Sequence, residues 1–98
     1  MVWKITQSLS FTFFIFDFSD NVLESFIKKF SSTKFKYIYG YTNSIVQFSR
    51  YLIDKGVILK NICPSLKLVI VTSEVCTKED RRIIEEAIGI SVVDEYGA

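Results

Sequence analysis

The sequence contains no histidine, and this absence excludes several kinds of active site. Without an imidazole there is no Ser-His-Asp triad, no histidine general base and no histidine ligand for zinc. The two cysteines, Cys63 and Cys76, lack CxxC spacing and lie near no other soft metal ligand. We therefore expect two reduced thiols, as in a cytoplasmic protein, and no metal site. Cys76 stands just before an expected helix, where a thiol pKa can be lowered, but the sequence shows no basic partner for it.

The sequence also lacks a strong net charge and a long apolar run. Lys and Arg number 12 and Asp and Glu number 11, so the formal net charge of +1 gives no basis for nucleic acid or a membrane as a partner. The apolar patch at residues 11–16 is far shorter than the roughly 20 residues that span a bilayer. Asp17 and Asp20 follow it without a small-residue cleavage site, so we interpret it as a strand and not as a signal peptide.

Glycine and proline are scarce, and the four glycines form no phosphate-binding motif. Neither GxxxxGKS/T nor GxGxxG occurs, so the sequence predicts neither a P-loop nor a dinucleotide-binding turn. No linker, internal repeat or low-complexity run divides the chain. We expect a single α/β segment at residues 1–98.

The last third of the sequence has the pattern of a strand, a helix and a second strand. Residues 66–71 form an apolar run interrupted only by Lys67, which suits a parallel strand buried on both faces. Thr77 opens the helix and Asp80 follows at the spacing of a capping box. The helix has an apolar stripe at helical period, made of Ile83, Ile84, Ala87 and Ile88. Gly89 stands where a left-handed residue ends a helix, and residues 90–93 form the second strand.

The same alternation occurs upstream, where strands are expected at residues 10–18 and 35–41. A polar break at residues 31–34 separates the first helix from the second strand, and residues 57–64 form a connector. The expected boundary residues are Ser19 or Asp20 before the first helix, Thr42 or Asn43 before the second, and Gly56 after it. The sequence therefore predicts an α/β fold with a mostly parallel sheet in β-α-β-α-β-α-β order and helices packed on it.

Polar turns follow three of the expected strands, at residues 40–42, 72–74 and 94–98. Because parallel strands place their carboxyl ends at one edge, where open α/β sheets bind ligands, we expect these turns to converge. Their hydroxyls, carboxylates, aromatic ring and backbone N–H groups suit a planar heterocycle. Such a ring would stack on Tyr96, and its exocyclic amine would donate to Asp94 or to a backbone carbonyl. The alternative is that these residues only form turns.

Three segments in this order, GYTNSIVQFSRYLIDKG, LKLVIVTSE and RRIIEEAIGISVVDEYGA, resemble adenylate-forming enzymes of the phenylacetate–CoA ligase type. The resemblance is closest to relatives found with capsular polysaccharide biosynthesis genes, and it covers about residues 10–98. It implies that the chain is a central fragment of the larger N-terminal domain of a cytoplasmic ligase. Such a ligase activates a carboxylic acid with ATP and Mg²⁺ as an acyl-AMP, and then passes the acyl group to a thiol, with CoA as a candidate acceptor.

The resemblance also implies a nucleotide site. Tyr96 would stack on adenine, Asp94 would face its amino group, and the backbone at residues 72–74 would cover the other face of the ring. The implied cofactor-binding residues are Thr72, Ser73, Glu74, Asp94, Glu95, Tyr96, Gly97 and Ala98. Tyr41 would line the acyl pocket.

The family's phosphate loop, magnesium-binding Glu and catalytic Lys have no counterpart in these residues. Because phosphoryl chemistry depends on those groups, we expect no catalytic residue here and no activity from the chain by itself. The alternative is a stand-alone flavodoxin-like binding or interaction module without catalysis. The phenylalanine-rich start at residues 11–18 predicts exposed apolar surface and self-association.

Overall fold

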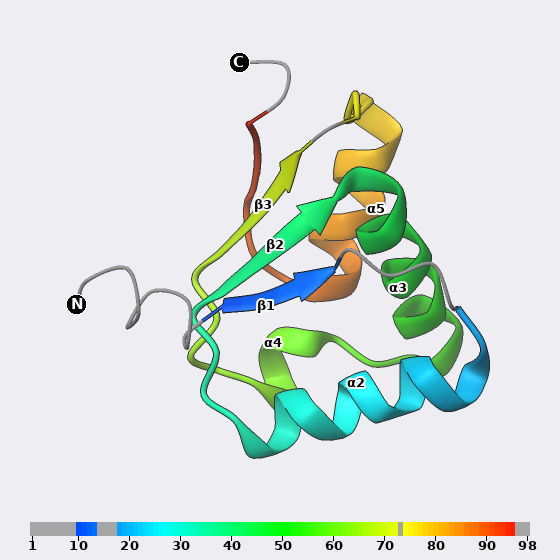
Figure 1. Cartoon of the computed structure of the whole chain (residues 1–98), viewed down its shortest axis with the longest axis vertical. Coiled ribbons are helices and arrows are strands. Elements are labelled where there is room, and N and C mark those ends of the chain that lie inside the picture. The colour runs from blue at the N-terminus through cyan, green and yellow to red at the C-terminus, as the bar shows by residue number, and fades with distance from the viewer. Residues whose placement is uncertain (1–9, 14–17, 73, 96–98) are drawn as a thin grey trace.

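One parallel sheet forms the centre of the computed structural model, which describes residues 10–13, 18–72 and 74–95 (Figure 1). Its strands are β1 (Ser10–Phe13), β2 (Tyr37–Tyr41), β3 (Leu68–Thr72) and β4 (Val92–Asp94). They lie in the order β1-β2-β3-β4, and every neighbouring pair is parallel. The expected α/β class and the alternation of strands and helices are therefore confirmed.

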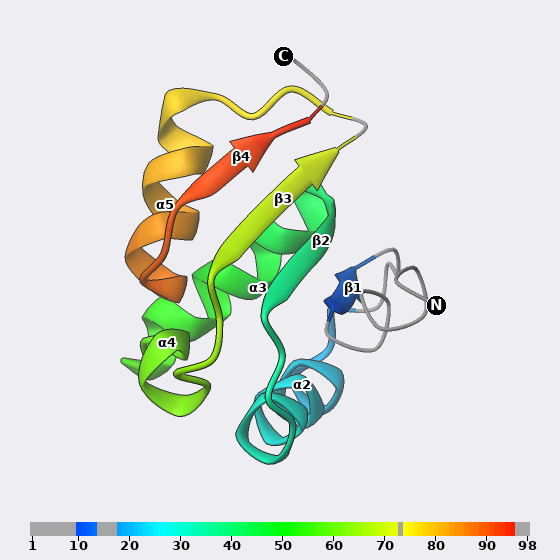
Figure 2. The same cartoon turned by 90° about the vertical axis from the view of Figure 1, so that its left-hand side faces the viewer.

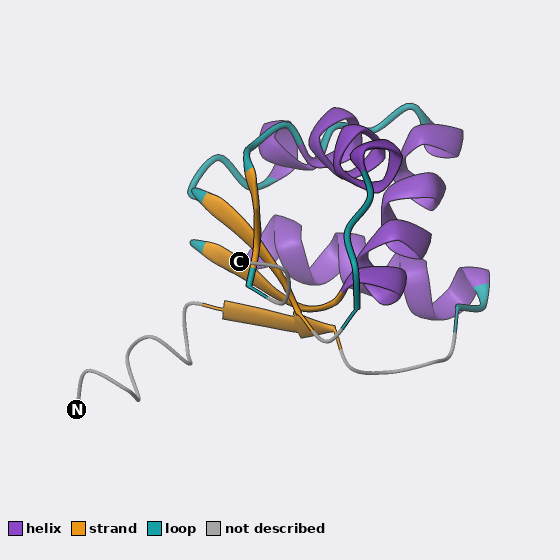
Figure 3. Ribbon diagram, turned by 90° about the horizontal axis from the view of Figure 1, so that it is seen from above, coloured by secondary structure: helices purple, strands orange, loops and turns teal. Residues whose placement is uncertain are grey.

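The helices lie on one face of this sheet. They are α2 (Asp20–Ser32), α3 (Thr42–Lys55), the short α4 (Leu59–Ile62) and α5 (Lys78–Ile88). Figure 2 shows the sheet with the helices behind it, and Figure 3 shows the same separation from above. Each strand is added beside the previous one without a reversal, so right-handed crossovers return every connection to the same face. The connector expected at residues 57–64 thus contains a helical turn, α4.

This strand order corrects one expectation. A flavodoxin-like sheet has the order 2-1-3-4-5, in which the first strand lies between the second and the third. Here β2 pairs directly with both β1 and β3. The flavodoxin-like form of the alternative is therefore wrong, because each described strand is added on the same side of the one before it.

The two faces of the sheet have different environments. Val69 and Val71 are fully buried toward the helices, whereas Leu68 and Ile70 are only partly buried on the opposite face. The expectation that residues 66–71 are buried on both faces is therefore wrong, because no described helix covers the second face. Tyr37, Tyr39 and Tyr41 of β2 share that open face with Leu68, Ile70 and Thr72 of β3.

An aromatic cluster fills the core between β1, α2 and α3. Phe30 of α2 is 1% exposed, and its ring lies 4.6 Å from that of Phe11 and 6.0 Å from that of Phe48. Phe11 and Phe18 are partly buried, and both pack against the core. Phe14 and Phe16 lie outside the described residues, so self-association through the phenylalanine-rich start stays a prediction.

The ends of the elements follow local sequence signals in most cases. Thr77 and Asp80 form the expected capping box of α5, and Gly56 and Gly89 end α3 and α5 with left-handed φ values of 69° and 88°. Ser19 occupies the N-cap position of α2, as expected. The strands at residues 37–41, 68–72 and 92–94 begin two residues later than expected, and α2 extends through the first part of the expected polar break. The expected strand at residues 10–18 is described only over β1, since residues 14–17 lie outside the described residues.

Candidate functional site

The carboxyl ends of β2, β3 and β4 meet at one edge of the sheet, as the sequence predicted. Tyr41 at the end of β2 pairs in register with Thr72 at the end of β3, and Val71 pairs with Asp94 at the end of β4. Three of the predicted site residues therefore occupy neighbouring strand ends. Ser73, Tyr96, Gly97 and Ala98 lie outside the described residues. The binding roles given to this edge of the sheet, called the rim below, therefore stay predictions.

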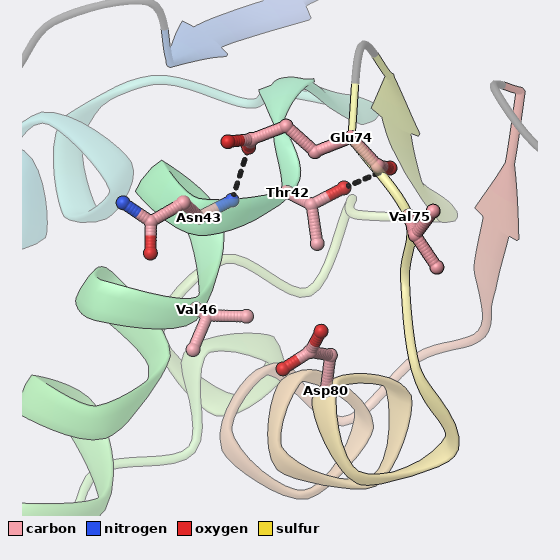
Figure 4. Close-up of a pocket in the computed structure, with 6 residues that line it drawn as sticks. All are labelled: Thr42, Asn43, Val46, Glu74, Val75 and Asp80. Atoms are coloured by element: carbon pink, nitrogen blue, oxygen red, sulfur yellow. Dashed lines mark hydrogen bonds between the residues drawn. The ribbon is translucent and has the colours of Figure 1, made fainter.

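Glu74 accepts two hydrogen bonds from the first residues of α3 (Figure 4). Its carboxylate Oε1 accepts a hydrogen bond from the backbone N–H of Asn43 at 2.8 Å, and its carbonyl accepts one from Thr42 Oγ1 at 3.0 Å. The residue at the N-cap position is Tyr41, which makes no side-chain capping bond. The expectation that Thr42 or Asn43 caps this helix is therefore wrong. A carboxylate from 31 residues along the chain takes that role, as the helix dipole favours.

A cleft of about 250 Å³ opens beside this cap. Thr42 and Asn43 of α3 line one side, Glu74 and Val75 line another, and Val46 and Asp80 complete it (Figure 4). Both α3 and α5 begin here, and a carboxylate lies at each N-terminus. Glu74 accepts from the N–H of Asn43, and Asp80 Oδ2 accepts from the N–H of Thr77 at 3.2 Å. Because those carboxylates occupy backbone N–H groups that would otherwise bind an anion, the cleft suits a hydrogen-bond donor better than a phosphate.

Replacing Glu74 by alanine tests its capping role. We expect Glu74→Ala to lower the free energy of unfolding by about 1 kcal/mol, the usual cost of losing an N-cap acceptor. Glu74→Gln is the matched control, because its amide oxygen still accepts from the N–H of Asn43. We expect it to lower the free energy of unfolding by only about 0.3 kcal/mol. Urea titration measures both values. Equal losses in the two variants would contradict the assignment of the hydrogen bond as the stabilising contact.

Tyr39 joins the strand ends on the open face of the sheet. Its hydroxyl donates a hydrogen bond to Glu95 Oε1 at 2.9 Å. This bond, followed by burial, raises the pKa of Tyr39, while a hydrogen bond with Thr72 opposes the shift. Glu95 and Thr72 were both predicted as site residues, but Tyr39 was not. The only sequence signal for it was the alternation that places Tyr37, Tyr39 and Tyr41 on one face.

The α5 helix holds β4 through two charged side chains. Arg81 donates to the carbonyl of Val92, and Glu85 Oε2 accepts from the N–H of Val92 at 3.1 Å. Two ion pairs along α5, Arg81–Glu85 and Arg82–Glu86, have N–O distances of 3.7 and 3.0 Å. Arg81 and Glu85 therefore do more than form a solvated pair, since they also satisfy the peptide groups of Val92 in the edge strand of the described sheet.

Cys76 does not have the environment of a reactive thiol. Burial is the main cause that raises its pKa, and the nearby charge of Arg81 only partly opposes this shift. Both Cys63 and Cys76 are free thiols. Within the described ranges, no group of three or more His, Cys, Asp or Glu side chains is arranged to hold a metal ion. The described helices are also too short or too polar for any of them to cross a bilayer.

Comparison with known proteins gives a match in structure and none in sequence. No protein-family model matches the chain, and a search of curated proteins finds no match either. In structure the chain is similar to 2-hydroxyisobutyryl-CoA ligase, as seen in a crystal structure of its open conformation in complex with 2-HIB-AMP and CoA. The TM-score is 0.62 and the sequence identity is 19%. The match covers 81% of this chain but only 19% of the ligase, so the chain shares its fold with part of that protein.

Proposed function

We propose that this chain is a segment of an ATP-dependent carboxylate-activating ligase and contributes the strand ends that bind adenine. The observation that carries the proposal is the convergence of the β2, β3 and β4 carboxyl ends, in a fold shared with part of an acyl-CoA ligase. That ligase was crystallised with an acyl-adenylate and CoA. The phenylacetate–CoA ligase type, the link to capsular polysaccharide genes, Mg²⁺, CoA and a cytoplasmic location belong to the same proposal.

In this proposal each rim segment has a separate task. Tyr96 stacks on the adenine ring, and Asp94 accepts a hydrogen bond from its amino group. Thr72, Ser73 and Glu74 cover the opposite face of the ring through their backbone, and Gly97 and Ala98 allow the backbone to approach the nucleotide. Tyr41 lines the pocket for the acyl group. Glu74 takes part in this contact through its backbone, since its carboxylate is already hydrogen-bonded to the N–H of Asn43.

The proposal assigns no catalytic step to this chain. The described residues form no group of three or more His, Cys, Asp or Glu that could hold Mg²⁺, and a carboxylate already accepts from a backbone N–H at the start of both α3 and α5. Phosphoryl and acyl transfer need cationic groups where negative charge develops. Those groups would come from other parts of the parent enzyme, and this segment would bind and orient the adenine.

Titration of the isotopically labelled chain with AMP tests adenine binding. Stacking of a base on an aromatic ring contributes about 1–3 kcal/mol, and a hydrogen bond adds about 1 kcal/mol. At the upper end of these values we expect a Kd on the order of 1 mM, with amide shifts at Glu74 and Glu95. UMP, which carries the same phosphate on a pyrimidine, should shift these amides much less, and Tyr96→Ala should weaken AMP binding at least about fivefold.

Two outcomes would contradict the proposal. One is the absence of amide shifts at the rim with AMP at about ten times the expected Kd, and the other is an equal response to AMP and UMP. The first outcome would favour a stand-alone interaction module without a nucleotide. The second would indicate binding through the phosphate alone, which the Glu74 and Asp80 carboxylates at the starts of α3 and α5 disfavour.

A further inference from the structure

Glu95 is held from two different strands. Its backbone N–H donates to the carbonyl of Val71 in β3 at 2.9 Å, and its carboxylate accepts from the Tyr39 hydroxyl of β2 at 2.9 Å. The strand that precedes it, β4, has only three residues and lies at the edge of the sheet. With so few ladder bonds along β4, these two contacts have a large influence on where the chain leaves the sheet.

Tyr39 contacts residues on both sides of the proposed adenine site. It lies on the central strand β2, in register with Ile70 of β3 and on the open face of the sheet. Its hydroxyl bonds to Glu95 beyond β4 and also interacts with Thr72 at the end of β3. One phenol therefore connects two strand ends that the proposed function assigns to opposite sides of a nucleotide.

We propose that Tyr39 is a positioning residue, which fixes the end of β4 through Glu95 and thereby holds Asp94 and Glu95 in place at the proposed adenine site. The inference about the ligand rests on the proposed function, whereas the positioning of Glu95 does not. A hydrogen bond between a phenol and a carboxylate is charge-assisted, and such bonds are shorter and stronger than neutral ones. Phenylalanine at this position keeps the ring and removes only the bond.

Amide hydrogen exchange of the full chain tests the positioning. In Tyr39→Phe we expect the Glu95 amide to exchange about three to ten times faster, the effect of losing one hydrogen bond. The amides of Ile38 and Val69, in the middle of the sheet, should keep their rates. Tyr37→Phe is the matched control, because it removes the hydroxyl of another tyrosine on the same face of β2. It should leave the exchange rate of the Glu95 amide unchanged. A Glu95 rate within twofold of the original, or equal acceleration at all slow amides, would overturn the inference.

AMP affinity then tests the link to the ligand. Tyr39→Phe should raise the Kd for AMP about three- to tenfold, in parallel with the faster exchange at Glu95, and Tyr37→Phe should not change it. An unchanged Kd beside faster exchange would refute the role of Tyr39 in nucleotide binding. If the original chain binds no AMP at all, the proposed function fails, and the exchange rates still decide whether Tyr39 positions Glu95.

Discussion

Phe30→Ala should lower the free energy of unfolding by about 3–5 kcal/mol, the usual cost of truncating a buried phenylalanine. Phe30 is 1% exposed, and its ring contacts aromatic rings from three other segments. It stacks on Phe11 and Phe48, and it meets Phe35 edge-on with 5.2 Å between the ring centroids. Removing this ring leaves a cavity between β1, α2 and α3, which closes only if these elements move toward one another and give up their other contacts.

Urea unfolding with two further variants makes this prediction measurable. Domains of this size have about 5–15 kcal/mol of stability in total, so Phe30→Ala can unfold the chain outright. Phe30→Leu retains most of the apolar volume and should cost about 1–2 kcal/mol. Ile53→Ala, on the exposed side of α3 at 41% exposure, should change stability by less than about 0.5 kcal/mol. A cost for Phe30→Ala no greater than that for Ile53→Ala would show that the aromatic cluster is not the core.

The features that the sequence predicted correctly are those with a local physical cause. The capping box of Thr77 and Asp80 needs only four consecutive residues, and the left-handed ends at Gly56 and Gly89 need only the absence of a Cβ. The apolar stripe of α5 follows from helical period alone. Parallel strands then follow from the alternation of strands with helices, which brings Tyr41, Thr72 and Asp94 to one edge.

The features that the sequence did not predict depend on contacts between distant residues. Nothing near Tyr41 indicates that Glu74 would cap the helix after it, because the two lie on different strand ends. An apolar run such as the one at β3 is equally compatible with burial on one face or on both, and the strand order decides between them. The bond between Tyr39 and Glu95 spans 56 residues, so it too becomes visible only in the folded sheet. At the candidate site, therefore, the edge was predictable but the side-chain contacts along it were not.

Gly89→Ala should destabilise the fold more than Gly56→Ala, although both glycines end helices in the left-handed region. Alanine at either φ value costs about 1–2 kcal/mol in backbone strain. A Cβ at Gly89 would also lie 3.0 Å from Ile58 Cγ2 and 3.2 Å from Lys60 Cβ, whereas a Cβ at Gly56 meets nothing within 4 Å. Gly89 thus ends α5 and also lets the residues around α4 approach the end of that helix closely.

The two losses should therefore differ by about 1 kcal/mol or more, the lower range of the cost of overpacking. We expect about 2–3 kcal/mol for Gly89→Ala and about 1–2 kcal/mol for Gly56→Ala, measured by urea unfolding. Ile58→Ala in the Gly89→Ala background removes the nearest contact and should recover part of the difference, since Ile58 is 46% exposed and adds little to the core. Equal losses at the two glycines, with no recovery in the double variant, would mean that α4 moves away freely and that Gly89 matters only for its φ value.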